Sequence, residues 1–179
     1  MVSDIASDDL GPWLSEHDLD QVRRKVPMLY VDIVPVRLAD GGVLDSVGLV
    51  LRGRPEGTIT RELVSGRVLH QETVRQAIAR HVEKDLGPLA LPQIPVSPAP
   101  FTIGEYFPTP GDHFVDRRQH AVSLAYVVPV AGDCSPANDT LEVTWLTPRE
   151  IVTPEILGDM SEGHAEIARR ALAHLGQLP

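Results

Sequence analysis

Apolar residues with a two-residue alternation, or in short continuous runs, mark the predicted strands. The segment 141–146 (LEVTWL) alternates strictly, and 120–130 (HAVSLAYVVPV) is almost wholly apolar or β-branched. Glycine, proline and aspartate separate these runs, as in Asp40-Gly41-Gly42 after the first of them. The pattern predicts strands over six ranges: 28–38, 46–52, 59–64, 101–107, 120–130 and 141–146.

Three other segments carry helical spacing. Ser15 followed by Asp18 has the form of a capping box and predicts a short helix over 16–25, with Leu19 and Val22 facing inward. A central helix is predicted from about 71 to 86, with a buried stripe of Val74, Ile78, Val82 and Leu86. The last helix is predicted from about 161 to 175, with a stripe of Ile167, Ala168, Ala171, Leu172 and Leu175. A helical turn begins at 147. Together these elements predict an α+β fold, a mixed sheet sandwiched between helices.

Length and composition narrow the classes of protein. The 179 residues suit one domain, predicted over 15–179, after a flexible segment 1–14. A net charge of −9 and a pI near 5.1 argue against nucleic acid as a partner. Cys134 is the only cysteine, so no internal disulfide can form. We find neither the pattern of a signal peptide nor an apolar run of membrane-spanning length, so a cytoplasmic protein without a membrane partner is expected.

The candidate chemistry lies between Ser65 and Gly87, around the central helix. On a helical wheel, His81, Lys84 and Asp85 share one flank beside the buried stripe, so one carboxylate faces that side. A Mg²⁺ ion prefers several hard oxygen ligands and bound phosphates. Lys84 would repel such an ion, or would hold a phosphate itself.

The segment has a recognisable frame. It consists of a glycine, five residues, a glutamate, seven residues and then the pattern R-x-V-x-x-acid-x-G. The residues at the fixed positions are Gly66, Glu72, Arg80, Val82, Asp85 and Gly87. This frame resembles the Nudix box of Mg²⁺-dependent hydrolases that cut nucleoside diphosphate derivatives. Three positions that usually hold glutamate are here His81, Lys84 and Asp85, so the box is degenerate. The resemblance implies the α/β/α Nudix fold and Mg²⁺ or Mn²⁺ as the cofactor, or no ion if the site is lost.

The resemblance extends over about residues 14–151, where LSEHDLDQVRRKVPMLYVDIVPVR, ELVSGRVLHQET, HAVSLAYVVPV and LEVTWLTPREI look like GDP-mannose mannosyl hydrolases. That branch has a depleted box, binds one Mg²⁺ and cleaves a nucleotide sugar by attack at the anomeric carbon. It implies a small-molecule nucleoside diphosphate derivative as the partner, and a homodimer.

Carried over by position, the resemblance implies metal ligands and phosphate contacts. Asp85 and the Ser65 carbonyl would bind the ion, and Glu72 is a further candidate, although a first helical turn favours an acid anyway. The diphosphate would meet arginines, which offer paired donors, and the lysine of the box. These basic candidates are Arg52, Arg54, Arg67 and Lys84.

The same comparison places Asp32 near the sugar or its leaving group and matches His120 to a histidine of the branch. The general base of the branch, a histidine shortly before the tryptophan that matches Trp145, is missing here. Asp139 or Glu142 could replace it, although an unshifted carboxylate is a weak base near neutrality.

Two functions remain open from the sequence. The first is an Mg²⁺-dependent hydrolase of a nucleoside diphosphate derivative, such as a nucleotide sugar. The second is a catalytically silent Nudix-fold module that binds a nucleotide or a protein partner. Lys84 and the missing histidine are explained directly by the second.

Overall fold

The computed structural model describes residues 13–53, 57–111, 114–136 and 139–177. Within them, eight strands form one mixed sheet with the order β3-β2-β1-β7-β5-β6, while β4 pairs with β1 and β8 with β2. The strands are β1 (Met28–Leu38), β2 (Leu44–Gly53), β3 (Ile59–Glu62), β4 (Val64–Arg67), β5 (Thr102–Phe107), β6 (Phe114–Val115), β7 (Ala121–Pro129) and β8 (Thr140–Leu146). The pairs β1–β7 and β5–β6 are parallel, and the others are antiparallel.

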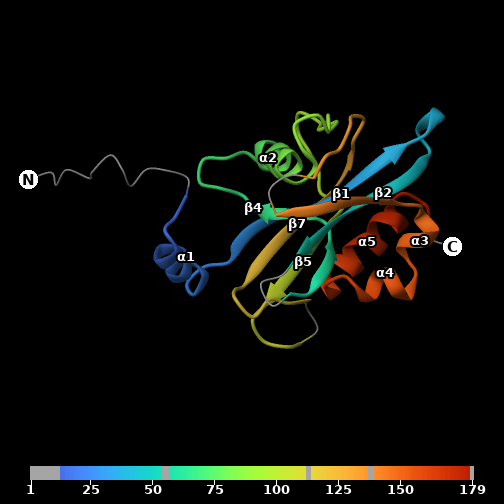
Figure 1. Ribbon diagram of the computed structural model, residues 1–179. Helices are drawn as coiled ribbons and strands as arrows, with labels where there is room; N and C mark the ends of the chain where they lie inside the picture. Colours follow the sequence, from blue (N-terminus) through green and yellow to red (C-terminus); the bar gives the residue numbers. More distant parts are fainter. Residues whose placement is uncertain (1–12, 54–56, 112–113, 137–138, 178–179) are drawn as a thin grey trace, which may run out of the picture.

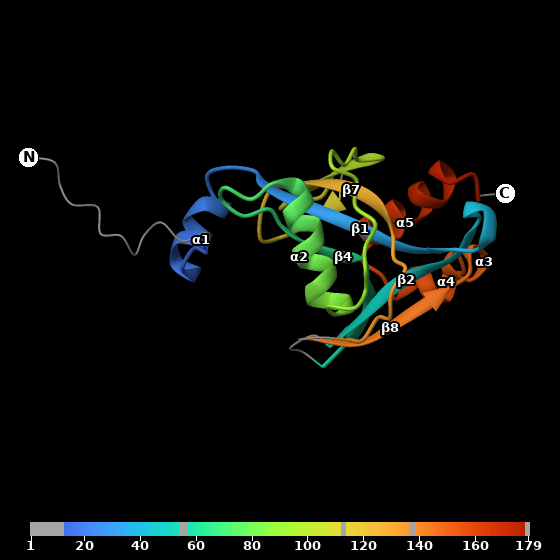
Figure 2. The same ribbon diagram turned by 90° about the horizontal axis from the view of Figure 1, so that it is seen from above.

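Helices cover both faces of this sheet (Figures 1 and 2). They are α1 (Glu16–Arg23), the 3-10 helix η2 (Asp40–Gly42), α2 (Val74–Leu86), α3 (Pro148–Ile151), α4 (Pro154–Gly158) and α5 (Glu162–His174). Helix α2 lies over one face, and α3, α4 and α5 lie on the other, whereas α1 stands to the side of the sheet (Figure 1). This is the predicted α/β/α arrangement.

Each sheet face has its own apolar core because side chains alternate along a strand. Val31 and Ile33 of β1 pack with Ile78 and Val82 under α2. The core on the other face includes Val34 and Val36 of β1 together with α5 residues of the predicted stripe, Ile167, Ala168, Ala171 and Leu172. Asp32 has the same parity as Val34, so its side chain is on the α5 face.

Local signals explain where the helices begin. The side chain of Ser15 caps α1 by accepting from the amide of Asp18, as predicted. Helix α2 begins later than predicted, at Val74, because Gln71 has a φ of 60° and Thr73 is the N-cap in a capping box. Glu72 therefore precedes the helix.

Some elements differ from those that the sequence predicts. Leu19 and Val22 were expected to face inward, but α1 has no fully buried residue, since this helix lies beside the sheet and not over it. The predicted strand 59–64 is divided into β3 and β4, which pair with different neighbours, β2 and β1. Helix α4 and the two-residue strand β6 were not predicted, since elements so short lack a periodic pattern.

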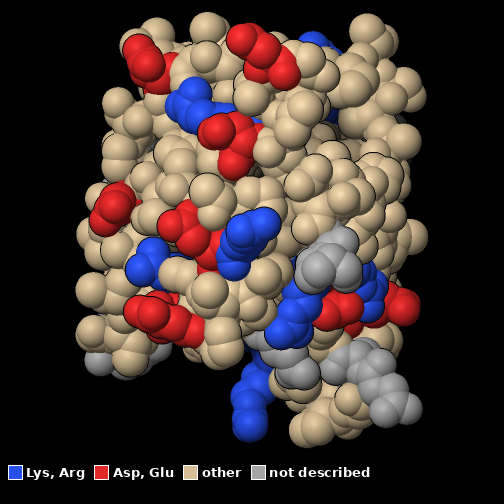
Figure 3. Space-filling model, turned by 90° about the vertical axis from the view of Figure 1, so that its right-hand side faces the viewer, with Lys and Arg blue, Asp and Glu red and all other residues tan. Residues whose placement is uncertain are grey.

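The surface mixes both signs of charge. On the face seen in Figure 3, acidic and basic side chains are interspersed. Within the described parts of the chain, none of the helices combines the length and the apolar composition that crossing a bilayer requires.

Candidate functional site

A cavity of about 580 Å³ opens beside the central strands. The ends of β2, β3 and α2 contribute charged side chains to one part of its wall, Arg52, Glu62 and Lys84. Strands β1 and β4 and helix α5 contribute Asp32, Ser65 and His164 to another part. A volume of a few hundred cubic ångströms is typical of sites for small ligands.

Arg52 is the centre of the charged part of the wall. Its Nη2 lies 2.5 Å from Asp85 Oδ2, its Nη1 lies 2.8 Å from Asp139 Oδ1, and its Nε lies 3.4 Å from Glu62 Oε2. Burial would lower the pKa of Arg52, but the charge of Asp85 raises it above its ordinary value. The guanidinium is therefore a permanent cation bound by three acids.

The sheet register explains why these groups meet. Val50 belongs to the core under α2, and Arg52 follows it by two residues, so Arg52 points to the same face. Glu62 is the cross-strand partner of Val50, which puts its side chain on that face as well. Asp85 is on α2, one turn after the buried His81. Its carboxylate therefore reaches Arg52 from the helix that covers this face of the sheet.

Lys84 adds a second basic group. Its Nζ lies 3.6 Å from Asp139 Oδ1 and 3.9 Å from Asp85 Oδ1. Asp139 is the exposed member of the cluster, with 62% of its side chain accessible. Burial would raise the pKa of Asp139, but Arg52 and Lys84 hold it below the ordinary value. The carboxylate stays ionised and is a poor proton acceptor near neutrality.

Asp32 is the centre of the second part of the wall. It is 2% exposed, its Oδ1 accepts a hydrogen bond of 2.6 Å from Ser65 Oγ, and Tyr106 OH lies 3.5 Å from its Oδ2. Burial would raise the pKa of Asp32, but the donors around it, His164 first, lower it. An ionised acceptor thus orients hydroxyl groups along the cavity.

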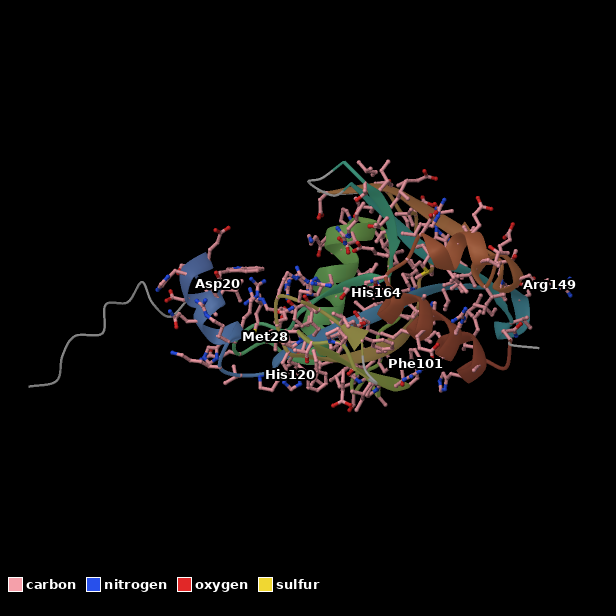
Figure 4. All side chains as sticks on the ribbon, turned by 90° about the horizontal axis from the view of Figure 1, so that it is seen from below. Asp20, Met28, Phe101, His120, Arg149 and His164 are labelled. Atoms are coloured by element: carbon pink, nitrogen blue, oxygen red, sulfur yellow. The ribbon has the colours of Figure 1, made fainter. Side chains whose placement is uncertain are left out.

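His164 is a functional candidate that sequence reasoning missed. It lies in the first turn of α5, near the middle of the molecule (Figure 4), and its Nε2 is 3.6 Å from Asp32 Oδ1. Its Nδ1 accepts a hydrogen bond from the amide of Leu63, so Nε2 carries the proton and faces the carboxylate. The available signal was a polar residue within the apolar face of the last helix.

Loop residues 116–118 form a further part of the wall. Asp116 accepts hydrogen bonds from Arg118 at 2.9 and 3.0 Å, so this pair is satisfied internally. Arg117 is exposed, and no ion pair of its side chain is seen with any described residue. Arg117 is therefore available to an anionic ligand.

The glutamate of the Nudix-like frame has a structural partner. Glu72 accepts hydrogen bonds of 2.7 and 2.8 Å from Arg80 and one from the amide of Leu69. The hydrogen bond from Arg80 lowers the pKa of Glu72. Glu72 thus ties the loop to α2, and it does not line the cavity.

Other predicted residues lie away from the cavity or beyond the described residues. Arg67 is partly buried, and its carbonyl accepts from Arg80 and His81. His120 stacks on Phe107 with 4.3 Å between ring centroids, and its carbonyl accepts from the amide of Met28 beside it in Figure 4. Glu142 is exposed on β8. Arg54 lies outside the described residues.

His81 fills the flank where the Nudix box usually has a glutamate. Its Nε2 donates to the Arg67 carbonyl at 2.9 Å, and its Nδ1 is buried without a hydrogen-bond partner. Burial lowers the pKa of His81 below the ordinary value of 6.5. The ring is therefore neutral and is a packing group, not a cation.

A pH dependence of stability follows. Because the folded-state pKa of His81 is lowered, the unfolded chain takes up the proton first as the pH falls, and stability is lost below about 6.5. We expect His81→Gln to flatten the dependence of the unfolding free energy on pH between about 7 and 5, measured by urea unfolding. A control at an exposed residue without an ionisable side chain, Ser97→Ala, should leave the slope as in the wild type. An unchanged slope in His81→Gln would contradict this assignment.

The residues present do not fit a Mg²⁺ ion. Asp85 is 0% exposed, and its Oδ2 is bound by Arg52, while its Oδ1 has no hydrogen-bond partner and lies 3.9 Å from Lys84 Nζ. An ion at Asp85 would meet two positive charges within about 4 Å. The Ser65 hydroxyl donates to Asp32, while the Ser65 carbonyl stays a prediction of the resemblance. Across the described residues, no group of three or more histidine, cysteine, aspartate or glutamate side chains is placed to hold a metal ion.

Comparison with a family model gives a match over nearly the whole chain. The model described as "Domain of unknown function (DUF4916)" covers residues 9–177. No curated protein matches the chain.

Solved structures share the fold. A protein of Jonesia denitrificans DSM 20603, described as a possible asymmetric diadenosine tetraphosphate (Ap4A) hydrolase, is 57% identical, with a TM-score of 0.83, and the match covers 87% of this chain and 98% of that one. The Nudix domain of Shewanella oneidensis NrtR, complexed with ADP ribose, is 18% identical, with a TM-score of 0.60 and coverages of 84% and 90%. A bifunctional NMN adenylyltransferase/ADP ribose pyrophosphatase of Francisella tularensis, complexed with AMP and a Mn ion, is also 18% identical, with a TM-score of 0.58 and coverages of 90% and 48%.

Proposed function

The chain belongs to the family described as Domain of unknown function (DUF4916), it has the Nudix fold, and we propose that it binds a nucleoside diphosphate derivative in the cavity beside Arg52. One observation carries this proposal. The basic residues Lys84 and Arg117 line one part of the cavity wall. The ionised Asp32, with hydroxyl groups around it, lines another part of the same wall. A ligand with both a diphosphate and a hydroxyl-rich sugar matches both parts.

The basic side receives the diphosphate. Arg117 has no acidic partner among the described residues, so it can give paired donors to phosphate oxygens. Lys84 Nζ lies 3.6 Å from Asp139 Oδ1 and 3.9 Å from Asp85 Oδ1. Both distances are longer than an optimal hydrogen bond, so a phosphate oxygen can replace one of these contacts. The buried Arg52 supports the positive potential behind them.

The acidic side receives sugar hydroxyls. A carboxylate oxygen accepts more than one hydrogen bond, and the contact of Asp32 Oδ2 with Tyr106 is long, at 3.5 Å, so this oxygen can accept from a ligand hydroxyl. Ser65 and Tyr106 already donate toward Asp32, and their oxygens can accept in turn. This chemistry suits a ribose or another sugar, which includes nucleotide sugars and dinucleoside polyphosphates.

The binding test uses three probes, GDP-mannose, ADP-ribose and diadenosine tetraphosphate, titrated calorimetrically in EDTA and in Mg²⁺. We expect at least one probe to bind, and Arg117→Ala to weaken it by about tenfold or more, since a charge-assisted hydrogen bond contributes about 1.5–3 kcal/mol. The control is Arg149→Ala, an exposed arginine at one end of the molecule, away from His164 (Figure 4). If no probe binds, or if Arg117→Ala binds like the wild type, the proposal is wrong.

Hydrolysis is the second candidate function. It is favoured by the 57% identical protein described as a possible Ap4A hydrolase. The same three probes test it through release of nucleotide with Mg²⁺ or Mn²⁺. Release that depends on the ion and disappears in Asp85→Asn would support hydrolysis. A homodimer and a cytoplasmic location stay predictions of the resemblance and of the sequence.

A further inference from the structure

Gln119 is a buried polar residue of the cavity wall that is not among the groups proposed to meet the ligand. It is 2% exposed and directly follows loop residues 116–118. Its Nε2 donates at 2.9 Å to both Tyr30 OH and Asp116 Oδ2, and its Oε1 accepts at 3.1 Å from Arg23 Nε. Both N–H groups and the oxygen of the carboxamide are therefore engaged.

The partners of Gln119 fix the orientation of its carboxamide. Burial would raise the pKa of Asp116, but hydrogen bonds from Arg118 and Gln119 lower it below the ordinary value, so Asp116 is ionised and only accepts. Arg23 only donates, so the oxygen of Gln119 has to face Arg23 and its nitrogen has to face Asp116. Three segments distant in sequence, α1, β1 and the loop, thus meet at one side chain in one arrangement.

This network holds the loop on both sides of Arg117. Before Arg117, the carbonyl of Asp116 accepts from the Gln119 amide at 3.2 Å. After it, Arg118 donates to the Asp116 carboxylate through its amide and its guanidinium. The Arg117 side chain has no ion pair with any described residue. Its neighbours therefore fix the backbone of Arg117 while its guanidinium stays available to the cavity.

Helix α1 reaches the same network from the side of the sheet (Figure 1). None of its residues is fully buried, and none lines the cavity. Arg23 lies in its last turn, has 23% of its side chain exposed and contacts Gln119, which is 96 residues later in the chain. A helix without a direct place at the cavity is thus connected to the loop that carries Arg117.

We propose that Arg23 and Gln119 are positioning residues for phosphate binding: the contact of α1 with Gln119 holds loop residues 116–118 in the arrangement that presents Arg117 to the cavity. This inference rests on the proposed function, in which Arg117 meets the phosphates. A loop that is already ordered loses less conformational entropy when it binds. The affinity for the ligand therefore depends on a helix that the ligand does not touch.

The binding test is a double-variant cycle, measured calorimetrically with the tightest-binding of GDP-mannose, ADP-ribose and diadenosine tetraphosphate. We expect Arg23→Ala to weaken binding by about threefold to tenfold, the factor that corresponds to ordering one side chain. In the Arg117→Ala background the same substitution should change the affinity by less than about twofold, because the loop no longer carries the group that it positions. A purely structural role of Arg23 would give the same loss in both backgrounds.

A second measurement needs no ligand. Hydrogen exchange, followed by mass spectrometry of the peptide that contains residues 116–119, should be faster in Arg23→Ala than in the wild type, because the network that holds the amides of Arg118 and Gln119 is weakened. Gln119→Met keeps the length of the side chain and removes its hydrogen bonds, so it should give the same result. The matched control, Arg24→Ala, removes the exposed arginine next to Arg23 and should change neither exchange nor affinity.

Faster exchange of the loop, together with a loss of affinity confined to proteins that contain Arg117, supports the proposal. Exchange in Arg23→Ala and Gln119→Met that equals the wild-type rate overturns it. Faster exchange with an unchanged affinity, or an equal loss of affinity in the Arg117→Ala background, also overturns it, although the proposed function then stands. If none of the probes binds to the wild type, the proposed function is wrong and the positioning role is wrong with it.

Discussion

Replacing Asp85 by alanine is expected to lower the free energy of unfolding by about 3 kcal/mol, near the lower end of the range for breaking a buried ion pair. Asp85 is 0% exposed and contacts Arg52 at 2.5 Å, so its removal leaves a buried guanidinium with a weaker set of partners. The value is at the lower end because Glu62 and Asp139 remain beside Arg52. Urea unfolding followed by circular dichroism measures the loss.

Two variants control this prediction. Glu83→Ala removes an exposed carboxylate from the same helix and should change the unfolding free energy by no more than about 0.5 kcal/mol. Asp85→Asn keeps an oxygen that can accept from Arg52, so its loss should lie between the other two. Equal stabilities of Asp85→Ala and Glu83→Ala would show that Arg52 does not depend on Asp85.

Gly66→Ala is expected to lower the unfolding free energy by about 1 to 3 kcal/mol, the usual effect of forcing atoms into a packed region. A Cβ atom at position 66 would lie 1.9 Å from His81 Cε1 and 2.4 Å from His81 Nε2. The ring cannot move at low cost, since it is buried and Nε2 donates to the Arg67 carbonyl. Thermal and urea unfolding of the variant measure the effect.

A double variant separates this clash from other causes. His81→Ala creates space at the point where the new methyl group would lie, so the loss caused by Gly66→Ala should be much smaller in the His81→Ala background. If Gly66→Ala costs the same in both backgrounds, the steric account is incorrect. The glycine of the Nudix-like frame is then required for another reason.

The sequence predicted the architecture because the pattern of apolar residues depends on local geometry. The apolar, β-branched runs of β1 and β7 and the stripe of α5 are properties of neighbouring residues, and both cores confirm them. The start of α2 was placed too early because the positive φ of Gln71 leaves no mark in the pattern. Glu72, expected in the first turn of this helix, therefore lies before it.

The candidate site could be predicted only in part. Asp32, Arg52 and Asp85 were singled out from the resemblance, and all of them belong to the cavity or its charged centre. Their partners could not be predicted, since Arg52 and Asp85 are 33 residues apart and their contact depends on how α2 lies on the sheet. His164 reaches Asp32 from α5, on the sheet face opposite to α2, and no local signal connects the two.

In the frame that resembles the Nudix box, the structural contacts are present, whereas the flank expected to hold an ion is basic or neutral. Glu72 and Arg80 are paired and hold the loop to α2. The flank that would hold an ion instead carries a neutral His81, the basic Lys84 and an Asp85 bound by Arg52. A fold can retain the scaffold of a phosphate site while changing the charge that faces the phosphate.

One measurement tests most directly whether a protein cation replaces the divalent ion: calorimetric titration of the tightest of the three probes into wild-type protein, first in excess EDTA and then in Mg²⁺. The account predicts dissociation constants that agree within about twofold, because Arg52, Lys84 and Arg117 supply the positive charge in both solutions. Binding that disappears in EDTA and returns with Mg²⁺ would contradict it, since the phosphate would then depend on an ion although Arg52 and Lys84 lie beside Asp85.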